Sequence, residues 1–257
     1  MGMDSHILAD ERQLAIRALL ASEGRVLASD LAARFGVSED TARRDLRSLA
    51  RAGLCRRVYG GAVPLAPHAM AIAERAEIAP QAKARLARRA LSLLEPGQLV
   101  LIDSGTTTMA LARALPPDLA ITVATPSIGV AAILAEHPSA RLIMLGGSFA
   151  PRTGACAGIE TLRAVERLAP DLCFLGACGL DARAGITAFD ADEADVKRAF
   201  VAVSRRLAVA ATADRIGTAA PFRVAPATAI DHLIVEAGAN AGELAAIAAL
   251  GCRVDAV

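Results

Sequence analysis

One stretch near the N-terminus concentrates positive charge. Between Thr41 and Gly60 the sequence has six arginines and a single acid, Asp45, which gives a net charge of +5 in twenty residues. Guanidinium groups donate paired hydrogen bonds to phosphate oxygens and to the O6 and N7 atoms of guanine. The whole chain carries a formal net charge of only +1, so this prediction depends on how the charge is distributed. The stretch predicts a surface that binds a polyanion.

A second group of residues could bind a small anion. The segment Asp103-Ser104-Gly105-Thr106-Thr107-Thr108 follows an apolar run that ends at Ile102 and precedes a helix predicted over Met109 to Ala114. Backbone N–H groups and hydroxyls at the start of a helix can hold a phosphate or a carboxylate. Serine and threonine at a helix start are also ordinary caps. The segment has neither a Walker lysine nor a G-x-G-x-x-G pattern, so its spacing leaves both interpretations open.

Lys197 is a third candidate because the chain uses arginine for nearly every positive charge. Of its 28 basic residues, only Lys83 and Lys197 are lysines. Glu193 precedes Lys197 by four residues and shares one face of a helix predicted over Asp192 to Ser204. From spacing alone, an exposed ion pair of small energetic value is the favoured interpretation.

The rest of the composition indicates no metal, cofactor or membrane partner. The five cysteines are scattered, with no C-x-x-C pair and no nearby histidine cluster, so neither a disulfide framework nor a zinc site is predicted. No run approaches the roughly 18 apolar residues of a membrane helix, and charged residues occupy the positions where a signal peptide is apolar. With 54% hydrophobic and 3% aromatic residues, we expect a cytoplasmic globular protein with an aliphatic core.

Three helices are predicted around the arginine-rich stretch. The first spans Glu11 to Ala21, and the second spans Ser29 to Phe35 and ends at Gly36. The third runs from its N-cap, Ser38, to about Ala52. The face of the first helix that is expected to be buried carries Leu14, Ala15, Ala18 and Leu19.

The third helix has two opposite faces and is followed by a predicted wing. Its apolar face carries Ala42, Leu46, Leu49 and Ala50, and its other face carries four arginines. A strand over Leu54 to Val58, a turn at Gly60-Gly61 and a return strand over Ala62 to Leu65 complete the wing. In a helix-turn-helix, such a second helix enters the major groove of double-stranded DNA. The residues predicted to contact DNA are Ser38, Thr41, Arg43, Arg44, Arg47, Arg51, Arg57 and Tyr59. The alternative is an ordinary solvated helix face.

This N-terminal pattern resembles the DNA-binding signature of the DeoR family of transcriptional regulators. The matching residues are the run from Gly36 to Leu46, followed by Leu49, Gly53-Leu54, Arg57 and Gly60-Gly61-Ala62-Val63. Two positions depart from the family pattern: Ala42 replaces a larger aliphatic residue, and Tyr59 replaces a histidine before the paired glycines. Neither departure removes a DNA contact of obvious importance.

Beyond the wing, apolar strands alternate with helices. Strands are predicted over Leu99 to Ile102, Ile121 to Ala124, Leu142 to Leu145, Leu172 to Leu175, Leu207 to Ala211 and Leu233 to Val235. Helices are predicted between them, and this alternation is typical of a Rossmann-like, mostly parallel sheet with helices on both faces. We therefore expect an α/β fold class with a winged helix-turn-helix over residues 1–65, a linker over 66–80 and an effector-sensing α/β domain over 81–257.

The larger domain also resembles the sensor half of the DeoR family, whose fold is similar to ribose-5-phosphate isomerase. The resemblance implies an effector pocket in which Ser104 to Thr107 take a phosphate, while Asp181, Glu193 and Lys197 face a sugar. The effector-binding residues that it implies are Asp103, Ser104, Gly105, Thr106, Thr107, Thr125, Gly146, Gly147, Asp181, Glu193 and Lys197. Two departures, Pro126 for asparagine and Arg215 for lysine, indicate an altered pocket or an unusual effector.

These patterns together predict a DNA-binding transcriptional repressor of carbohydrate or related catabolic genes. A phosphorylated sugar or similar small anion would bind the larger domain and lower the affinity for the DNA operator. The family resemblance implies a homo-oligomer, in keeping with the paired half-sites that helix-turn-helix dimers bind. The alternative is a sugar-phosphate isomerase-like enzyme with an appended DNA-binding domain. It is disfavoured because the fuller catalytic motif of that enzyme family is absent around Asp181.

Overall fold

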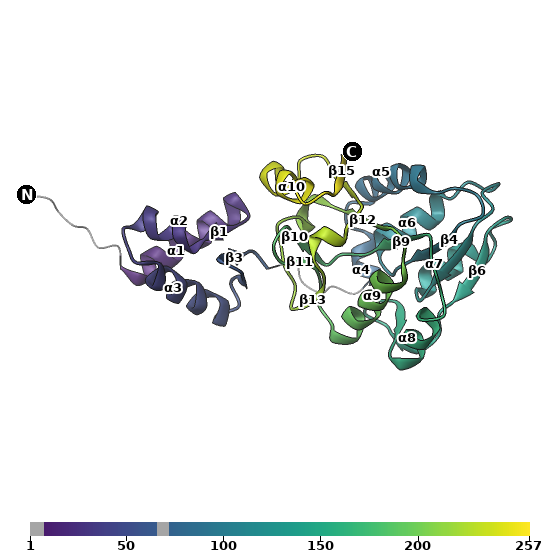
Figure 1. The fold of residues 1–257 in the computed structure, drawn as a ribbon, viewed down its shortest axis with the longest axis horizontal. Coiled ribbons are helices and arrows are strands. Elements are labelled where there is room, and N and C mark those ends of the chain that lie inside the picture. The colour runs from purple at the N-terminus through teal and green to yellow at the C-terminus, as the bar shows by residue number, and fades with distance from the viewer. Residues whose placement is uncertain (1–7, 66–71) are drawn as a thin grey trace, which may run out of the picture.

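The computed structural model describes residues 8–65 and 72–257 and shows a small N-terminal lobe beside a larger lobe built on a central sheet (Figure 1). Of the predicted linker, residues 66–71 lie outside the described ranges. The part that follows contains the short helix α4 (Ile72–Ala76). Over the described ranges, no helix combines the length and the apolar character needed to cross a membrane.

The small lobe is a winged helix-turn-helix. Its elements are α1 (Ala9–Glu23), β1 (Val26–Leu27), α2 (Ala28–Phe35), α3 (Glu39–Arg51), β2 (Arg56–Val58) and β3 (Gly61–Val63). Ser38 caps α3 as predicted, because its hydroxyl accepts a hydrogen bond from the Thr41 N–H at 3.2 Å. Gly36 ends α2 with a left-handed φ of 63°, which sets the tight turn between the two helices.

The buried face of α1 differs from the predicted one. Leu14 is 66% exposed, whereas Ile16 is fully buried in the core of the lobe. The reason is the buried ion pair in which Arg12 Nε lies 2.5 Å from Asp45 Oδ2 of α3. This pair and Ile16 fix the rotation of α1 about its axis, so of the four residues predicted to be buried only Leu19 reaches the cluster.

The wing contains a strand that the sequence did not reveal. β1 pairs with β3 in an antiparallel sheet of order β1-β3-β2. Because β1 passes directly over Gly61, a Cβ atom at this position would lie 2.0 Å from the carbonyl oxygen of Val26. The close approach of β1 thus requires the second glycine of the predicted turn, whereas the first, Gly60, has a positive φ of 77°.

The large lobe is built on a seven-stranded parallel sheet of order β15-β14-β12-β9-β4-β5-β6. Its strands are β4 (Leu99–Ile102), β5 (Thr122–Thr125), β6 (Arg141–Met144), β9 (Leu172–Leu175), β12 (Leu207–Ala211), β14 (His232–Val235) and β15 (Arg253–Ala256). Leu101 of β4 pairs in register with Ala124 of β5 and Cys173 of β9. The α/β class and the parallel sheet are confirmed, and β15 is an additional edge strand.

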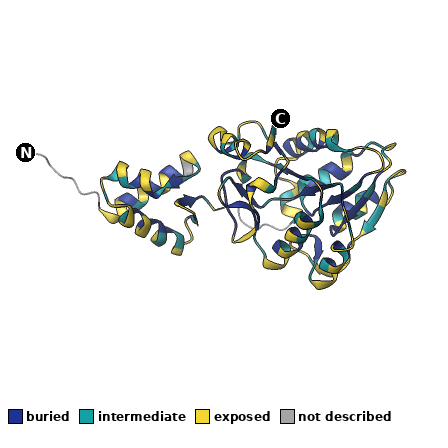
Figure 2. Cartoon of the chain, viewed as in Figure 1, coloured by how far each residue is buried: buried dark blue, intermediate teal, exposed yellow. Residues whose placement is uncertain are grey.

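Helices cover both faces of this sheet (Figures 1 and 2). The helices of one face are α5 (Pro80–Ala90), α6 (Thr106–Ala114) and α7 (Ile128–Leu134). Those of the other face are α8 (Ile159–Val165), α9 (Ala191–Val203) and α10 (Ala241–Ala248). Adjacent strand residues point to opposite sides: Ile102 packs with the first set and Leu101 with the second. The two layers of core are mostly aliphatic, as the composition predicts.

Short antiparallel strands complete the large lobe. β10 (Gly179–Asp181), β11 (Gly185–Ala188) and β13 (Phe222–Ala225) form one small sheet, and β7 (Ser148–Ala150) pairs with β8 (Ala155–Ala157) in another. In Figure 1 the sheet of β10, β11 and β13 lies on the side of the large lobe that is next to the small lobe. It therefore lies between the small lobe and the central sheet.

Candidate functional site

A cavity of about 470 Å³ lies where the strand order of the central sheet reverses. From β4 the chain proceeds to β5 and β6 on one side, whereas β9, β12 and β14 follow on the other side. In open α/β sheets, ligands bind beyond the carboxyl ends of the strands at such a switch point. The cavity is lined by Arg75, Ile78, Ala79, Lys83, residues 104–108, 176–178 and 210–215, Glu193, Lys197 and Glu236.

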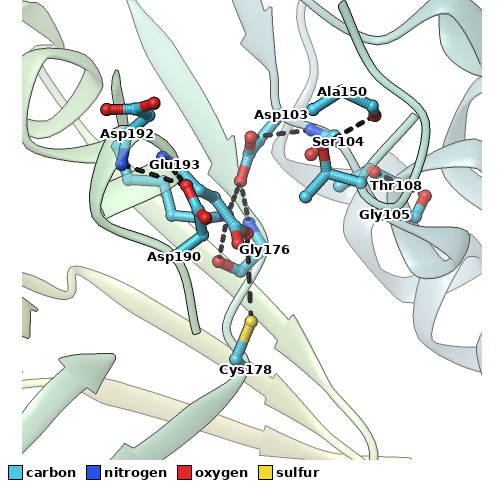
Figure 3. A network of polar contacts seen from close by, with 12 residues as sticks. Asp103, Ser104, Gly105, Thr108, Ala150, Gly176, Cys178, Asp190, Asp192 and Glu193 are labelled. Atoms are coloured by element: carbon cyan, nitrogen blue, oxygen red, sulfur yellow. Dashed lines mark hydrogen bonds and ion pairs between the residues drawn. The ribbon is translucent and has the colours of Figure 1, made fainter. Parts of the chain in front are cut away.

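Beneath the cavity, Asp103 and Lys197 form a buried ion pair (Figure 3 shows Asp103 and its neighbours). Asp103 accepts hydrogen bonds from the N–H groups of Ser104 at 2.7 Å and Gly176 at 2.8 Å. It thereby joins the end of β4 to the end of β9. A Cβ atom at Gly176 would lie 2.8 Å from the Ser104 carbonyl oxygen, so this junction requires glycine.

The ammonium group of Lys197 makes two hydrogen bonds and two ion pairs within the protein. It donates hydrogen bonds to Asp103 and, at 2.8 Å, to the carbonyl oxygen of Gly176, and it lies 3.4 Å from Glu193 Oε1. Burial alone would lower the pKa of Lys197, but the charges of Asp103 and Glu193 outweigh this effect and raise it. Lys197 therefore stays protonated and holds the floor of the cavity together.

The N-terminus of α6 opens onto the cavity through residues 104–108. Gly105 occupies the N-cap position and has no side chain with which to cap the helix. The Thr108 hydroxyl donates to the Gly105 carbonyl oxygen at 2.9 Å, whereas no contact within the described ranges engages the Thr106 and Thr107 hydroxyls. These hydroxyls and the first-turn N–H groups are the kind of donors that bind an anion at a helix N-terminus.

Three cations from separate elements, Arg75, Lys83 and Arg215, also line the cavity. Lys83 of α5 is only 7% exposed, and its ammonium donates to the Arg75 carbonyl oxygen at 2.5 Å. No carboxylate of the described residues lies within 4 Å of Lys83 Nζ. Burial lowers the pKa of Lys83, and the positive charges of Arg75 and Arg215 lower it further, while the carboxylates of Asp214 and Glu77 oppose this shift with smaller effects. An anion bound among these three groups would relieve the cost of burying the ammonium.

The two arginines of this cluster are only partly satisfied by protein contacts. Arg75 Nε is buried and has no hydrogen-bond partner among the described residues. Arg215 donates to the Cys178 carbonyl oxygen at 3.1 Å and lies 3.2 Å from Asp214. Sequence reasoning did not place Arg75 or Lys83 in a pocket and treated Arg215 only as a departure from the family pattern. The rarity of lysine was a usable signal, since both lysines of the chain line this cavity.

The predicted effector-binding residues do not all meet in the cavity. Ser104, Gly105, Thr106, Thr107, Glu193 and Lys197 line it, and Asp103 lies beneath it. Thr125, Gly146, Gly147 and Asp181 do not line it. The Thr125 hydroxyl accepts the Ser127 N–H at 3.1 Å, and the Gly146 carbonyl accepts the Thr161 hydroxyl at 2.7 Å. Asp181 is buried at the β10–β11 turn.

In the small lobe, α3 presents the predicted DNA-reading arginines to solvent. Arg43 lies 2.6 Å from Glu39, Arg44 lies 3.1 Å from Asp40, and Arg47 lies 3.7 Å from Asp40. Exposed pairs of this kind contribute only about 0–1 kcal/mol, so the guanidinium groups can exchange these carboxylates for phosphates or bases. Ser38, Arg51, Arg57 and Tyr59 are also exposed, and Thr41 is half-buried beside Ser38. Asp45, which sequence reasoning counted only as the lone acid, instead holds α3 to α1.

Two known domain families match the chain. The DeoR-like helix-turn-helix domain matches residues 12–67, and the DeoR C terminal sensor domain matches residues 78–237. The cavity lining, from Arg75 to Glu236, falls almost entirely within the second match. The two matches follow each other along the chain in the order in which the structure places the small and large lobes.

Individual relatives are similar over most of their length. The HTH-type transcriptional regulator GlpR of Haloferax volcanii is 32% identical over 96% of this chain and 96% of its own. The glycerol-3-phosphate regulon repressor of Escherichia coli is 29% identical over 88% and 90%, respectively. Among solved structures, ribose 5-phosphate isomerase A of Methanocaldococcus jannaschii aligns with a TM-score of 0.38 and 13% identity, over 51% of this chain and 52% of that one.

Proposed function

The chain belongs to the DeoR family of transcriptional regulators, and we propose that it represses transcription until a small phosphorylated metabolite binds the cavity of its sensor domain. Its relatives are named as regulators and repressors and not as enzymes. An isomerase function with an appended DNA-binding domain therefore has no support beyond the fold. The DNA-binding domain would span residues 1–65, the linker 66–80 and the sensor domain 81–257.

The exposed arginine face of α3 supports the proposed mode of DNA binding. Ser38, Thr41, Arg43 and Arg44 lie toward the N-terminal end of α3, which in a helix-turn-helix is directed at base edges. Arg47 and Arg51 follow along the same helix and would contact phosphates. Arg57 and Tyr59 of the wing would contact the DNA backbone or the minor groove. Operators with paired half-sites would require a homo-oligomer.

Lys83 is the observation that carries the proposal of an anionic effector. No carboxylate of the described residues forms an ion pair with this buried ammonium, and Asp214 and Glu77 offset the cost of its burial only in part, so a ligand with a negative charge would stabilise it. Arg75, Arg215 and the N-terminus of α6 add donors around the same space. The cavity volume of about 470 Å³ is in the range of small-molecule sites. Glycerol 3-phosphate, which the name of one relative contains, has the required phosphate and polyol groups.

The proposed roles of the predicted residues that line the cavity follow from their contacts. Ser104 to Thr107 would hold the phosphate together with Lys83, and Glu193 would accept hydrogen bonds from ligand hydroxyls. Lys197 would position Asp103 and Glu193 and would not bind the phosphate itself, because it donates hydrogen bonds to Asp103 and Gly176 and forms an ion pair with Glu193. Arg215 keeps a positive charge at the cavity where the family resemblance leads one to expect lysine.

A thermal-shift screen of phosphorylated polyols and sugars tests the effector proposal. A ligand at 100 times its dissociation constant stabilises the folded protein by about 2.7 kcal/mol. For a compound that does so, we expect Lys83→Met to raise the Kd by roughly 10-fold to 150-fold, since a hydrogen bond to a charged group contributes about 1.5–3 kcal/mol. Arg88→Ala, which removes an exposed cation from the same helix, is the matched control. Equal affinity in wild type and Lys83→Met would place the anion elsewhere.

The lowered pKa of Lys83 predicts that ligand binding weakens at alkaline pH. Burial and the charges of Arg75 and Arg215 make Lys83 lose its proton below the ordinary lysine value of 10.5. A phosphate binds the ammonium and not the neutral amine, so affinity should fall as the pH rises toward the lowered pKa. Titration calorimetry between pH 7 and 10 measures this, and Lys83→Arg should remove much of the fall because guanidinium stays protonated. If the ligand affinity of Lys83→Arg falls with pH as steeply as that of wild type, a titrating group other than Lys83 causes the fall.

A further inference from the structure

Arg25 of the DNA-binding domain reaches into an acidic pair of the sensor domain. It follows α1 and precedes β1, and its Nη1 atom lies 3.4 Å from Glu243 Oε2 and 3.7 Å from Asp181 Oδ2. The Arg25 side chain is 23% exposed, whereas those of Asp181 and Glu243 are 0% and 5% exposed. The contact is therefore shielded from water on the sensor side.

Each carboxylate of this pair uses one oxygen to fold the sensor domain and directs the other toward Arg25. Asp181 Oδ1 accepts the N–H groups of Arg183 at 2.9 Å and Ala184 at 2.7 Å, which closes the β10–β11 turn. Glu243, which lies on α10, accepts a hydrogen bond from the Ala182 N–H through its Oε1 atom. Within residues 8–65 and 72–257, Asp181 Oδ2 has no hydrogen-bond partner. Burial and the neighbouring Asp181 raise the pKa of Glu243. Among the described residues, Arg25 is the cation that lies within 4 Å of both carboxylates and offsets the repulsion between them.

The wing adds a second set of contacts to the same hairpin. Val58 and Val63 of the wing pack with Ala184 and Ala219 in a buried cluster. Arg183 donates to the Tyr59 carbonyl oxygen at 3.2 Å. These contacts use the inner side of the wing and leave the arginine face of α3 uncovered. The DNA-binding domain is thus docked on the sensor domain without its proposed DNA surface being blocked.

Two segments lead directly from the cavity to this interface. Cys178 lines the cavity and is followed at once by β10, which ends at Asp181. Arg215 also lines the cavity and is followed by Gly217, whose N–H donates to the Leu180 carbonyl oxygen at 2.7 Å. Arg215 itself donates to the Cys178 carbonyl oxygen at 3.1 Å. A displacement of either segment at the cavity would move the carboxylate that faces Arg25.

We propose that Arg25 and the Asp181–Glu243 pair form a latch that fixes the orientation of the DNA-binding domain on the sensor domain. Its regulatory consequence rests on the proposed function: a ligand that moves residues 176–181 would loosen the latch and change how the reading helices of an oligomer are spaced. The latch itself requires neither DNA nor ligand. Asp181 therefore acts at the interface between the domains and not at the ligand.

The test measures an interdomain distance in the full-length protein without ligand. All five native cysteines are buried, so spin labels can be directed to the exposed positions Arg17→Cys on α1 and Arg88→Cys on α5. The test variants are Arg25→Ala and the double variant Asp181→Asn with Glu243→Gln. The amides keep the oxygen that accepts each backbone N–H, so the hairpin can keep its turn while the charge is lost. Glu160→Gln, which removes a carboxylate from an exposed ion pair with Arg163, is the control.

We expect one narrow distance distribution in wild type and in Glu160→Gln, and a distribution at least twofold wider in both test variants. Arg25→Lys, which keeps the charge, should lie between them. If the distance distributions of both test variants are as narrow as that of wild type, the proposal of a latch is wrong. Circular dichroism and the ligand-induced thermal shift of the same variants show whether each domain is folded. A wild type that binds neither DNA nor phosphorylated ligands would contradict the proposed function and leave the distance result standing.

Discussion

Replacing Arg43 and Arg44 together with alanine is expected to weaken operator binding by roughly 30-fold to 20,000-fold, since each arginine that reads a base contributes about 1–3 kcal/mol. Both side chains are exposed at the N-terminal end of α3, and each forms an ion pair with a carboxylate of its own helix. Those exposed pairs cost little to break. If either arginine contacts a phosphate instead, the salt dependence of binding flattens by about one unit of slope for each lost contact.

Fluorescence anisotropy with labelled operator DNA at several salt concentrations measures both quantities. Arg163→Ala is the matched control, because Arg163 is equally exposed and ion-paired within its own helix but lies in the sensor domain. A double variant that binds the operator as tightly as wild type, with the same salt slope, would remove α3 from the DNA interface.

The second large effect is expected for Asp45→Ala. This substitution should lower the free energy of unfolding of the DNA-binding domain. The loss is about 3–5 kcal/mol, the usual cost of removing one partner from a buried ion pair. Arg12 Nε donates to Asp45 Oδ2 at 2.5 Å and Arg12 Nη2 donates to Asp45 Oδ1 at 3.1 Å, so both carboxylate oxygens hold α1 to α3. The arginine face of α3 should lose its fixed orientation as a result.

Hydrogen exchange of the amides in α1 and α3 reports this loss directly. Exchange should accelerate by roughly 100-fold or more in Asp45→Ala, because protection in a cooperative unit follows its free energy of opening. Asp40→Ala, which removes an exposed partner of Arg44 from the same helix, should cost only about 1 kcal/mol or less. Equal protection of α1 and α3 in the two variants would contradict the structural role of the Arg12–Asp45 pair.

The elements of the fold that were predictable are those with strong local signals. Gly36 and Ser38 bracket the turn of the helix-turn-helix, and both have the conformation that their residue types favour. The central strands are continuous apolar runs, and three of the six predicted strands have the observed bounds. The antiparallel strands of three or four residues around β10 and β11 were missed, because so short a segment shows no periodicity.

The rotation of α1 could not be read from its sequence for a different reason. Leu14 and Ile16 are both apolar, and the choice between them is made by an ion pair to a residue 33 positions away. Helical periodicity places charged residues such as Arg12 on the face of the helix that contacts solvent. The structure buries it, so the face that follows Arg12 at helical spacing is the one that packs.

The candidate site shows a similar division between local and long-range information. The segment from Ser104 to Thr107 was predicted from its place between a strand and a helix, and it lines the cavity. Lys83 could be singled out only by the rarity of lysine, because nothing in its local sequence shows that α5 brings it to the ends of the strands. Asp181 was implied as an effector ligand by resemblance, yet its contacts are to a turn and to Arg25 of the other domain.

The most direct test of the account combines both domains in one measurement. Anisotropy of labelled DNA from the region upstream of the protein's own gene is followed at low ionic strength, first alone and then with the phosphorylated compound that stabilises the protein most. We predict tight, salt-dependent binding that the compound weakens by about 5-fold to 150-fold, the range of a 1–3 kcal/mol coupling. Lys83→Met should bind this DNA normally but release it only at a much higher concentration of the compound. Absence of binding to this DNA, or release that is identical in Lys83→Met, would contradict the account.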